Sequence, residues 1–135
     1  MTSVNLEALR AEVRAWLQEN IPVNLEMPRG GRDLSPELMQ WTLEFRRKLG
    51  HKGWLAPTWP TYFGGSGLPG AAGAVIQQEL SRYSLPALPI NLLWLTALRA
   101  WGTEEQKGAW LTPSLRGEIT VKQILSEPRG GSDLA

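Results

Sequence analysis

The stretch richest in reactive groups is the end of the chain, ITVKQILSEPRGGSDLA. Its Ser-Glu-Pro-Arg-Gly-Gly-Ser-Asp run combines hydroxyls, carboxylates and a cation with two residues of unusual backbone freedom. Pro128 removes one backbone donor, whereas Gly130 and Gly131 reach conformations that are closed to other residues. Such a turn can aim several successive N–H groups at one point, and Ser126 and Ser132 add hydroxyls on either side. The run therefore predicts a polar loop suited to a phosphate or another electron-rich ligand.

A predicted strand leads into this loop. Ile119 and Val121 alternate with the polar Thr120 and Lys122, which is the period-two pattern of a half-buried strand. A single strand has no hydrogen-bond partners in a chain whose other segments are predicted to be helices. We therefore expect residues 119–123 to be the first strand of a sheet whose other strands are missing, so that the chain is a piece of something longer.

The rest of the chain is predicted to be all-α, a bundle of about five helices followed by the orphan strand and its loop. Apolar residues recur at helical spacing over residues 4–19, 36–50, 68–83, 91–101 and 103–111. Ser35 and the Thr103–Gln106 pair are helix-start signals. Pro113 is expected to divide the last segment into a helix to about Leu111 and a separate short turn through Arg116. The helix at 91–101 is apolar around most of its circumference, so we expect it to be buried on several sides. Two domains follow: a helical one at 1–118, and the start of a truncated β domain at 119–135.

Composition argues against several functional classes. The chain has no cysteine, which excludes disulfides and thiolate metal sites, and no metal site is predicted. A net charge of +1 with scattered basic residues argues against a nucleic-acid partner. No apolar run is long enough to enter a membrane, and the N-terminus lacks the apolar run of a signal peptide, so a cytoplasmic protein is expected. His51, the one histidine, has no partners nearby in sequence and is interpreted as a helix-terminal or surface residue.

One carboxylate allows two interpretations. Glu79 lies beside the inner face of its predicted helix, and a buried carboxylate with a raised pKa could act as a base. An ion pair with Arg82, three residues on, is the ordinary explanation.

The terminal run also resembles a known signature. SEPRGGSD is similar to the first signature of the acyl-CoA dehydrogenase family, in which Ser or Thr, Glu, Pro, two small residues and Ser-Asp follow a short strand. Two upstream segments, GWLAPTWPTYFGGSGL and WGTEEQKGAWLTPSLRGEI, resemble the same family in the same order. The resemblance covers most of the chain after Leu49, and three ordered segments are far more specific than one.

The resemblance implies a helical N-terminal domain, a β middle domain and a helical C-terminal domain. It implies an FAD-dependent oxidation of an acyl-CoA thioester to the trans-2-enoyl form, in which a base removes the α proton and the flavin takes a hydride from the β carbon. It further implies electron-transfer flavoprotein as a partner and a full-length parent that is a homo-oligomer, either a dimer or a tetramer. The family's catalytic base is a glutamate in the C-terminal half, and no residue here matches it. No catalytic residue is therefore assigned, and we expect this chain alone to be inactive and not to retain FAD.

Carried over residue by residue, the resemblance implies two sets of contacts. The FAD contacts are Gln123, Leu125, Ser126 and Ser132. The substrate contacts are Gly131 and Ser132 at the pantetheine arm, and Trp94 and Leu95 on the apolar helix that borders the acyl pocket. Core packing is the alternative for the last two residues.

Two positions depart from the family pattern. Ile124 stands where a small residue is usual, and Arg129 replaces a position that is commonly small. Arg129 either adds a cation near the phosphates or points to solvent. Two other functions stay open: a flavin oxidase or monooxygenase on the same fold, and a non-catalytic helical interaction subunit that has lost its flavin.

Overall fold

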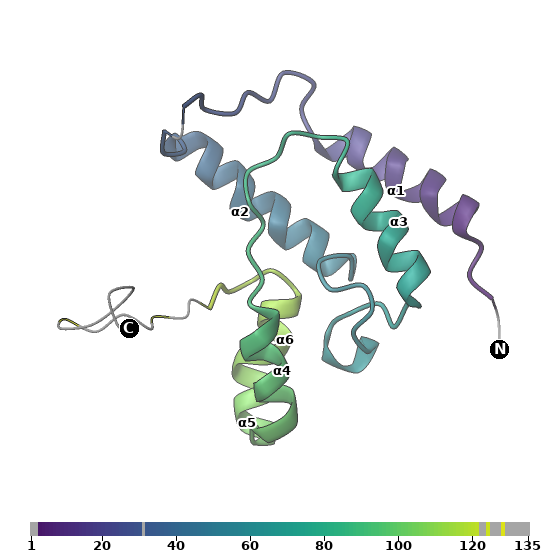
Figure 1. The fold of residues 1–135 in the computed structure, drawn as a ribbon, viewed down its shortest axis with the longest axis vertical. Coiled ribbons are helices and arrows are strands. Elements are labelled where there is room, and N and C mark those ends of the chain that lie inside the picture. The colour runs from purple at the N-terminus through teal and green to yellow at the C-terminus, as the bar shows by residue number, and fades with distance from the viewer. Residues whose placement is uncertain (1–2, 31, 122–123, 125–127, 129–135) are drawn as a thin grey trace, which may run out of the picture.

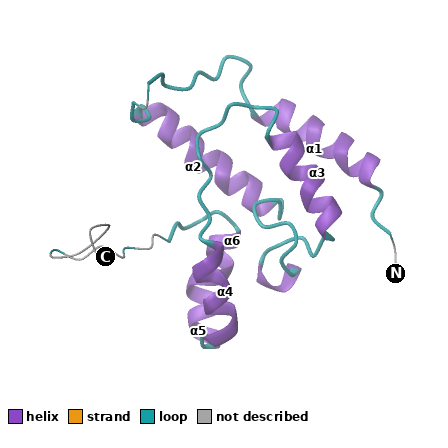
Figure 2. Cartoon of the chain, in the orientation of Figure 1, coloured by secondary structure: helices purple, strands orange, loops and turns teal. Residues whose placement is uncertain are grey.

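The computed structural model describes residues 3–30, 32–121, 124 and 128. Within these ranges the regular structure is helical and no strand is present (Figures 1 and 2), which confirms the all-α prediction. The helices are α1 (Leu6–Asn20), α2 (Pro36–His51), α3 (Gly70–Leu80), α4 (Leu92–Trp101), α5 (Glu104–Gln106) and α6 (Thr112–Leu115). A 3₁₀ turn η1 (Thr61–Phe63) lies in the loop before α3, and a π-helical turn η2 (Lys107–Leu111) joins α5 to α6. No helix in this part of the chain is long and apolar enough to cross a membrane.

Side-chain caps explain where two of the helices begin. Ser35 accepts a hydrogen bond from the backbone N–H of Leu38 at 3.1 Å, and Pro36 occupies the first position of α2. Thr103 and Gln106 form a reciprocal capping box at the start of α5, with bonds of 3.1 and 2.9 Å. Both caps confirm the sequence prediction, because caps depend only on residues three apart.

The first hydrophobic core lies between α1, α2 and α3. Figure 1 shows α1 and α3 side by side, with α2 next to them. Trp16 packs against Phe45 and Trp54, and Trp41 stacks on Phe45 with ring centroids 5.0 Å apart. The buried residues of this core are Leu9, Val13, Leu17, Ile21, Phe45, Leu49, Trp54, Ala72, Val75 and Ile76.

A second, smaller core lies between α4 and the helical segment that follows it. It buries Ala56, Leu95, Leu98, Leu111 and Leu115. The predicted division of this segment at Pro113 into a helix and a separate turn is wrong, because α5, η2 and α6 run without a break from Glu104 to Leu115. In η2 the N–H of Thr112 bonds to the carbonyl of Lys107, five residues back. This wider turn skips one α-helical bond, so Pro113 sits at the start of the next turn, where no N–H donor is needed.

One face of α4 is open. Only Leu95 and Leu98 are buried on this helix, whereas Leu93 is 73% exposed and Trp101 is 89% exposed. The expectation that α4 is buried on several sides is therefore wrong for the described residues. The reason is that α5–α6 and the loop before α3 cover it from one side only.

The two cores meet where the backbone of α2 touches the turn after α6. A Cβ placed on Gly50 would lie 2.2 Å from the carbonyl oxygen of Arg116, and one placed on Gly117 would lie 2.4 Å from the carbonyl oxygen of Arg46. Neither position has room for a side chain. The chain then continues through residues 119–121 without strand pairing, and 122–123 lie outside the described residues. A strand needs a neighbour to pair with, so the strand and the domain boundary at 118 stay predictions.

Candidate functional site

All residues assigned to the cofactor and the pantetheine arm lie outside the described residues. These are Gln123, Leu125, Ser126, Gly131 and Ser132, so their contacts remain predictions. Ile124 is described, and its side chain is 85% exposed. Arg129 also lies outside the described residues.

The two residues assigned to the acyl pocket on α4 contact other parts of the same chain. Leu95 is 1% exposed and belongs to the second core. Trp94 is partly buried against that core, and its ring lies 6.3 Å from the ring of Trp110. In this part of the chain both side chains pack as core residues do, and a role beside a substrate stays a prediction.

A buried arginine holds both connections of the second core to α2. Arg46 is 2% exposed, and its Nε donates to the carbonyl of Pro89 at 3.0 Å while its Nη1 donates to the carbonyl of Ile119 at 3.1 Å. Pro89 precedes α4 and Ile119 follows α6. One guanidinium therefore fixes the points at which the chain enters and leaves the segment from α4 to α6, which carries most of the second core. Burial lowers the pKa of Arg46, yet a guanidinium remains a cation at neutral pH.

The role of Arg46 was not predicted from the sequence. No role is assigned to Arg46 from the sequence, although it lies at helical spacing with the buried Thr42, Phe45 and Leu49. That spacing was the available signal. The two carbonyls it binds could not be inferred, because they belong to distant segments.

Replacing Arg46 with methionine is expected to destabilise the fold by about 3 kcal/mol. The change removes two hydrogen bonds from a charged donor, each worth about 1.5–3 kcal/mol, while methionine recovers part of the packing. Arg46→Lys should restore little, because one ammonium lacks the planar fork that reaches two carbonyls. Urea unfolding measures the effect, with the exposed neighbour Arg47→Met as control. Equal stabilities of the two methionine variants would contradict this role.

A second cluster of charges joins α1 to α3. The side chain of Glu79 is 2% exposed and accepts from Arg10 at 3.0 Å, from Arg14 at 2.9 and 3.1 Å, and from Arg82 at 3.2 Å. The hydrogen bonds from Arg14, joined by those from Arg10 and Arg82, lower the pKa of Glu79 to about 2 against the opposing effect of burial. Glu79 is therefore ionised at neutral pH. The interpretation as a base with a raised pKa is wrong, the pair with Arg82 is confirmed, and the two arginines of α1 were missed.

The histidine is where the sequence analysis placed it. His51 is the last residue of α2 and exposed, and its Nε2 lies 3.1 Å from a carboxylate oxygen of Glu118. In the described ranges no three His, Cys, Asp or Glu side chains gather as metal ligands would. The pair ties the end of α2 to the turn after α6.

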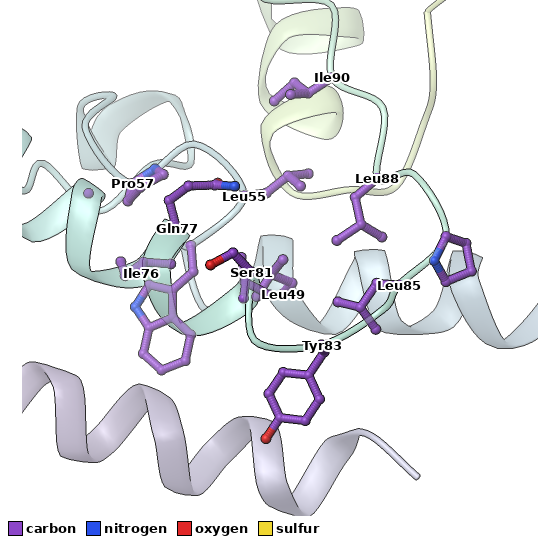
Figure 3. A pocket seen from close by; sticks show the side chains of 14 residues that line it. Leu49, Leu55, Pro57, Ile76, Gln77, Ser81, Tyr83, Leu85, Leu88 and Ile90 are labelled. Carbon is purple, nitrogen blue, oxygen red and sulfur yellow. The ribbon is translucent and has the colours of Figure 1, made fainter. Parts of the chain in front are cut away.

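A cavity lies between α2, α3 and the connection to α4 (Figure 3). We call it the interhelical cavity; its volume is about 320 Å³. Its lining combines the buried Leu49, Trp54 and Ile76 with half-buried aliphatic side chains such as Leu85 and Leu88. It contains neither Trp94 nor Leu95, so it was not foreseen from the sequence.

The lining of the interhelical cavity offers no carboxylate, imidazole or ammonium group for acid–base catalysis. None of its 14 lining residues is charged, and its polar side chains are those of Gln77, Ser81 and Tyr83. A second hollow of about 330 Å³ lies between α2 and the turn after α6. Both volumes are at the small end of the range of roughly 300–1,000 Å³ for drug-sized ligands, and FAD is larger than such a ligand. The described residues alone therefore do not fit a flavin dinucleotide.

Comparison with known proteins gives a consistent result. The family model described as "Acyl-CoA dehydrogenase, N-terminal domain" matches residues 3–118. Human mitochondrial short-chain specific acyl-CoA dehydrogenase is 38% identical over 91 residues, which are 64% of this chain and 22% of that protein. The (2S)-methylsuccinyl-CoA dehydrogenase of Cereibacter sphaeroides is 30% identical over 132 residues, which are 96% of this chain and 23% of that protein.

A solved structure supports the same relationship. The Tcur3481-Tcur3483 steroid ACAD superimposes on 98% of this chain with a TM-score of 0.67 and 28% sequence identity. The match covers 34% of that chain. The chain thus spans between about a fifth and a third of the length of these relatives.

Proposed function

The chain belongs to the acyl-CoA dehydrogenase family, and we propose that it forms the helical N-terminal domain of an enzyme that oxidises an acyl-CoA thioester to its trans-2-enoyl form. The observation that carries the proposal is the match of residues 3–118 to the N-terminal domain of that family. The chain spans only 22% and 23% of two relatives, so the activity is proposed for a longer parent.

The proposed cofactor is FAD, which accepts the hydride when bound. The assigned contacts are the tail residues Gln123, Leu125, Ser126 and Ser132, and the remaining walls would come from a β domain. The contacts of residues 117 and 119 with α2 support this proposal. Arg46 binds the carbonyl of Ile119, four residues before Gln123, and Gly117 packs its backbone on α2. These contacts set the starting point of the tail.

The substrate contacts of the proposal are those assigned from the resemblance. Gly131 and Ser132 would meet the pantetheine arm, and Trp94 and Leu95 would border the acyl group from α4. The open face of α4, with Leu93 and Trp101 exposed, supports an apolar neighbour for this helix in the parent. Electron-transfer flavoprotein as electron acceptor, a homo-oligomeric parent and a cytoplasmic location remain predictions.

Two alternatives are distinguished by different measurements. A flavin oxidase or monooxygenase on the same fold would bind flavin but pass its electrons to oxygen, so oxygen consumption in the parent identifies it. A non-catalytic interaction subunit would bind no flavin even as the full-length parent, so the flavin content of the parent identifies it. The sequence of any reading frame beyond Ala135 would distinguish these functions best. The dehydrogenase proposal requires it to encode a β domain and then helices that carry the catalytic glutamate.

The purified chain is expected to be colourless and inactive. The described cavities are too small for FAD, and no catalytic base is assigned to this chain. The absorbance spectrum after incubation with FAD and gel filtration measures retention, and acyl-CoA with an artificial electron acceptor measures turnover. Retention of one FAD per chain would contradict this prediction, because it would show that the chain binds FAD without a β domain. The proposed reaction itself is tested in the parent, where loss of acyl-CoA oxidation despite bound flavin would exclude it.

A further inference from the structure

We propose that the interhelical cavity is a binding site for a small, uncharged hydrophobic molecule. This site is separate from the residues assigned to flavin and acyl-CoA, and it belongs to the helical domain by itself. The proposal does not depend on the reaction proposed above.

Size is the first argument. An apolar cavity of about 150 Å³ holds benzene, and the interhelical cavity, at about 320 Å³, has roughly twice that volume. A two-ring aromatic group, or a branched hydrocarbon of similar bulk, therefore fits.

The floor and walls are the second argument. Leu49, Trp54 and Ile76 are almost completely buried and form the floor. Around them stand aliphatic side chains that are only half-buried, namely Leu55, Leu80, Leu85, Leu88 and Ile90. Figure 3 shows Leu49, Leu85 and Leu88 converging from α2 and the connection to α4. A hydrophobic guest would remove part of these walls from water, at about 25 cal/mol per Å² of apolar surface buried.

Charge is the third argument, and it narrows the ligand class. No charged side chain lines the cavity, so a carboxylate or ammonium entering it would lose water without gaining a partner. The polar side chains, those of Gln77, Ser81 and Tyr83, lie on or just after the C-terminal end of α3. The hydroxyl of Ser81 donates to the carbonyl of Gln78 at 2.7 Å and keeps its lone pairs for a donor. A neutral ligand with one hydroxyl at its end matches this arrangement.

The test titrates the 135-residue chain with 2-naphthol and, separately, with 2-naphthoate, while methyl signals are followed by NMR. The two probes share the ring system and differ in charge. We expect 2-naphthol to shift the methyl signals of Ile76 and Leu88 in a saturable way, and 2-naphthoate to bind at least tenfold more weakly. Equal binding of both probes, or no saturable shift with 2-naphthol, overturns the proposal.

Variants locate the binding site. Leu88→Trp fills the cavity, and Gln77→Trp narrows its mouth from an exposed position, so each should weaken 2-naphthol binding at least tenfold. Leu93→Trp makes the matched change on the open face of α4 and should leave binding unchanged. The unfolding midpoint of each variant reports whether the variant folds. If Leu88→Trp or Gln77→Trp does not fold, the comparison of the two probes on the unaltered chain decides the proposal.

Two further outcomes also contradict the proposal. Shifts centred on Leu93 and Trp101 instead of Ile76 and Leu88 would place the probe on the open face of α4. Nuclear Overhauser contacts to Leu88 from residues outside the described ranges, observed without probe, would show that the protein itself fills the cavity.

Discussion

Glu79→Gln is expected to lower the free energy of unfolding by about 3 kcal/mol at neutral pH. Glutamine keeps the shape of the side chain, but the three arginines that surround it lose the negative charge with which all three pair. A fall of the pKa of Glu79 from 4.5 to about 2 corresponds to about this amount, because each tenfold change in proton affinity is worth 1.36 kcal/mol. For a domain of this size the unfolding midpoint should fall by about 10 °C. Thermal unfolding followed by circular dichroism measures it.

Glu12→Gln is the matched control for this change. Glu12 lies on the same helix as Arg10 and Arg14, is 60% exposed, and pairs with Lys52 at 3.7 Å. Exposed pairs of this kind contribute about 0–1 kcal/mol. If the two glutamine variants lose equal stability, the cluster at Glu79 does not hold α1 to α3.

The same carboxylate predicts how stability depends on pH. Its pKa is lower in the folded chain than in the unfolded chain, so its contribution is complete above about pH 4.5 and is lost as the pH falls toward 2. Glu79→Gln removes this part of the acid dependence. The difference in unfolding free energy between wild type and variant should therefore shrink between pH 5 and pH 2, and a constant difference would contradict the lowered pKa.

Gly117→Ala is expected to cost about 3 kcal/mol or more. Gly117 has a φ of +72°, where an alanine is strained by about 1–2 kcal/mol. Its Cβ would also lie 2.4 Å from the carbonyl oxygen of Arg46, a backbone atom that cannot turn aside. Overpacking of this kind costs a further 1–3 kcal/mol, because α2 and the turn after α6 must separate. Urea unfolding measures the loss.

Gly30→Ala separates the two causes. Gly30 has a similar φ of +68°, and a Cβ there would meet nothing within 4 Å. This variant should show only the conformational cost. If Gly117→Ala costs no more than Gly30→Ala, the close approach of the two backbones does not contribute to stability.

The sequence by itself determined the local structure of single segments and the resemblance to a family. Helix type follows from the spacing of apolar residues along one segment, and the caps at Ser35 and Thr103 need partners only three residues away. The three ordered segments pointed to the family that the comparison then showed. Each of these features is encoded in a short stretch of chain, so it can be recognised without coordinates.

What only the tertiary structure decided involves groups far apart in the chain. Glu79 meets Arg10 and Arg14 across 69 and 65 residues, and Arg46 meets Ile119 across 73. A charge pattern along one helix does not reveal which carbonyl or carboxylate another segment brings to it. The exposure of α4 and the interhelical cavity depend in the same way on which segments pack together. Burial and pKa are properties of that packing, and so these sites appear only when the chain is folded.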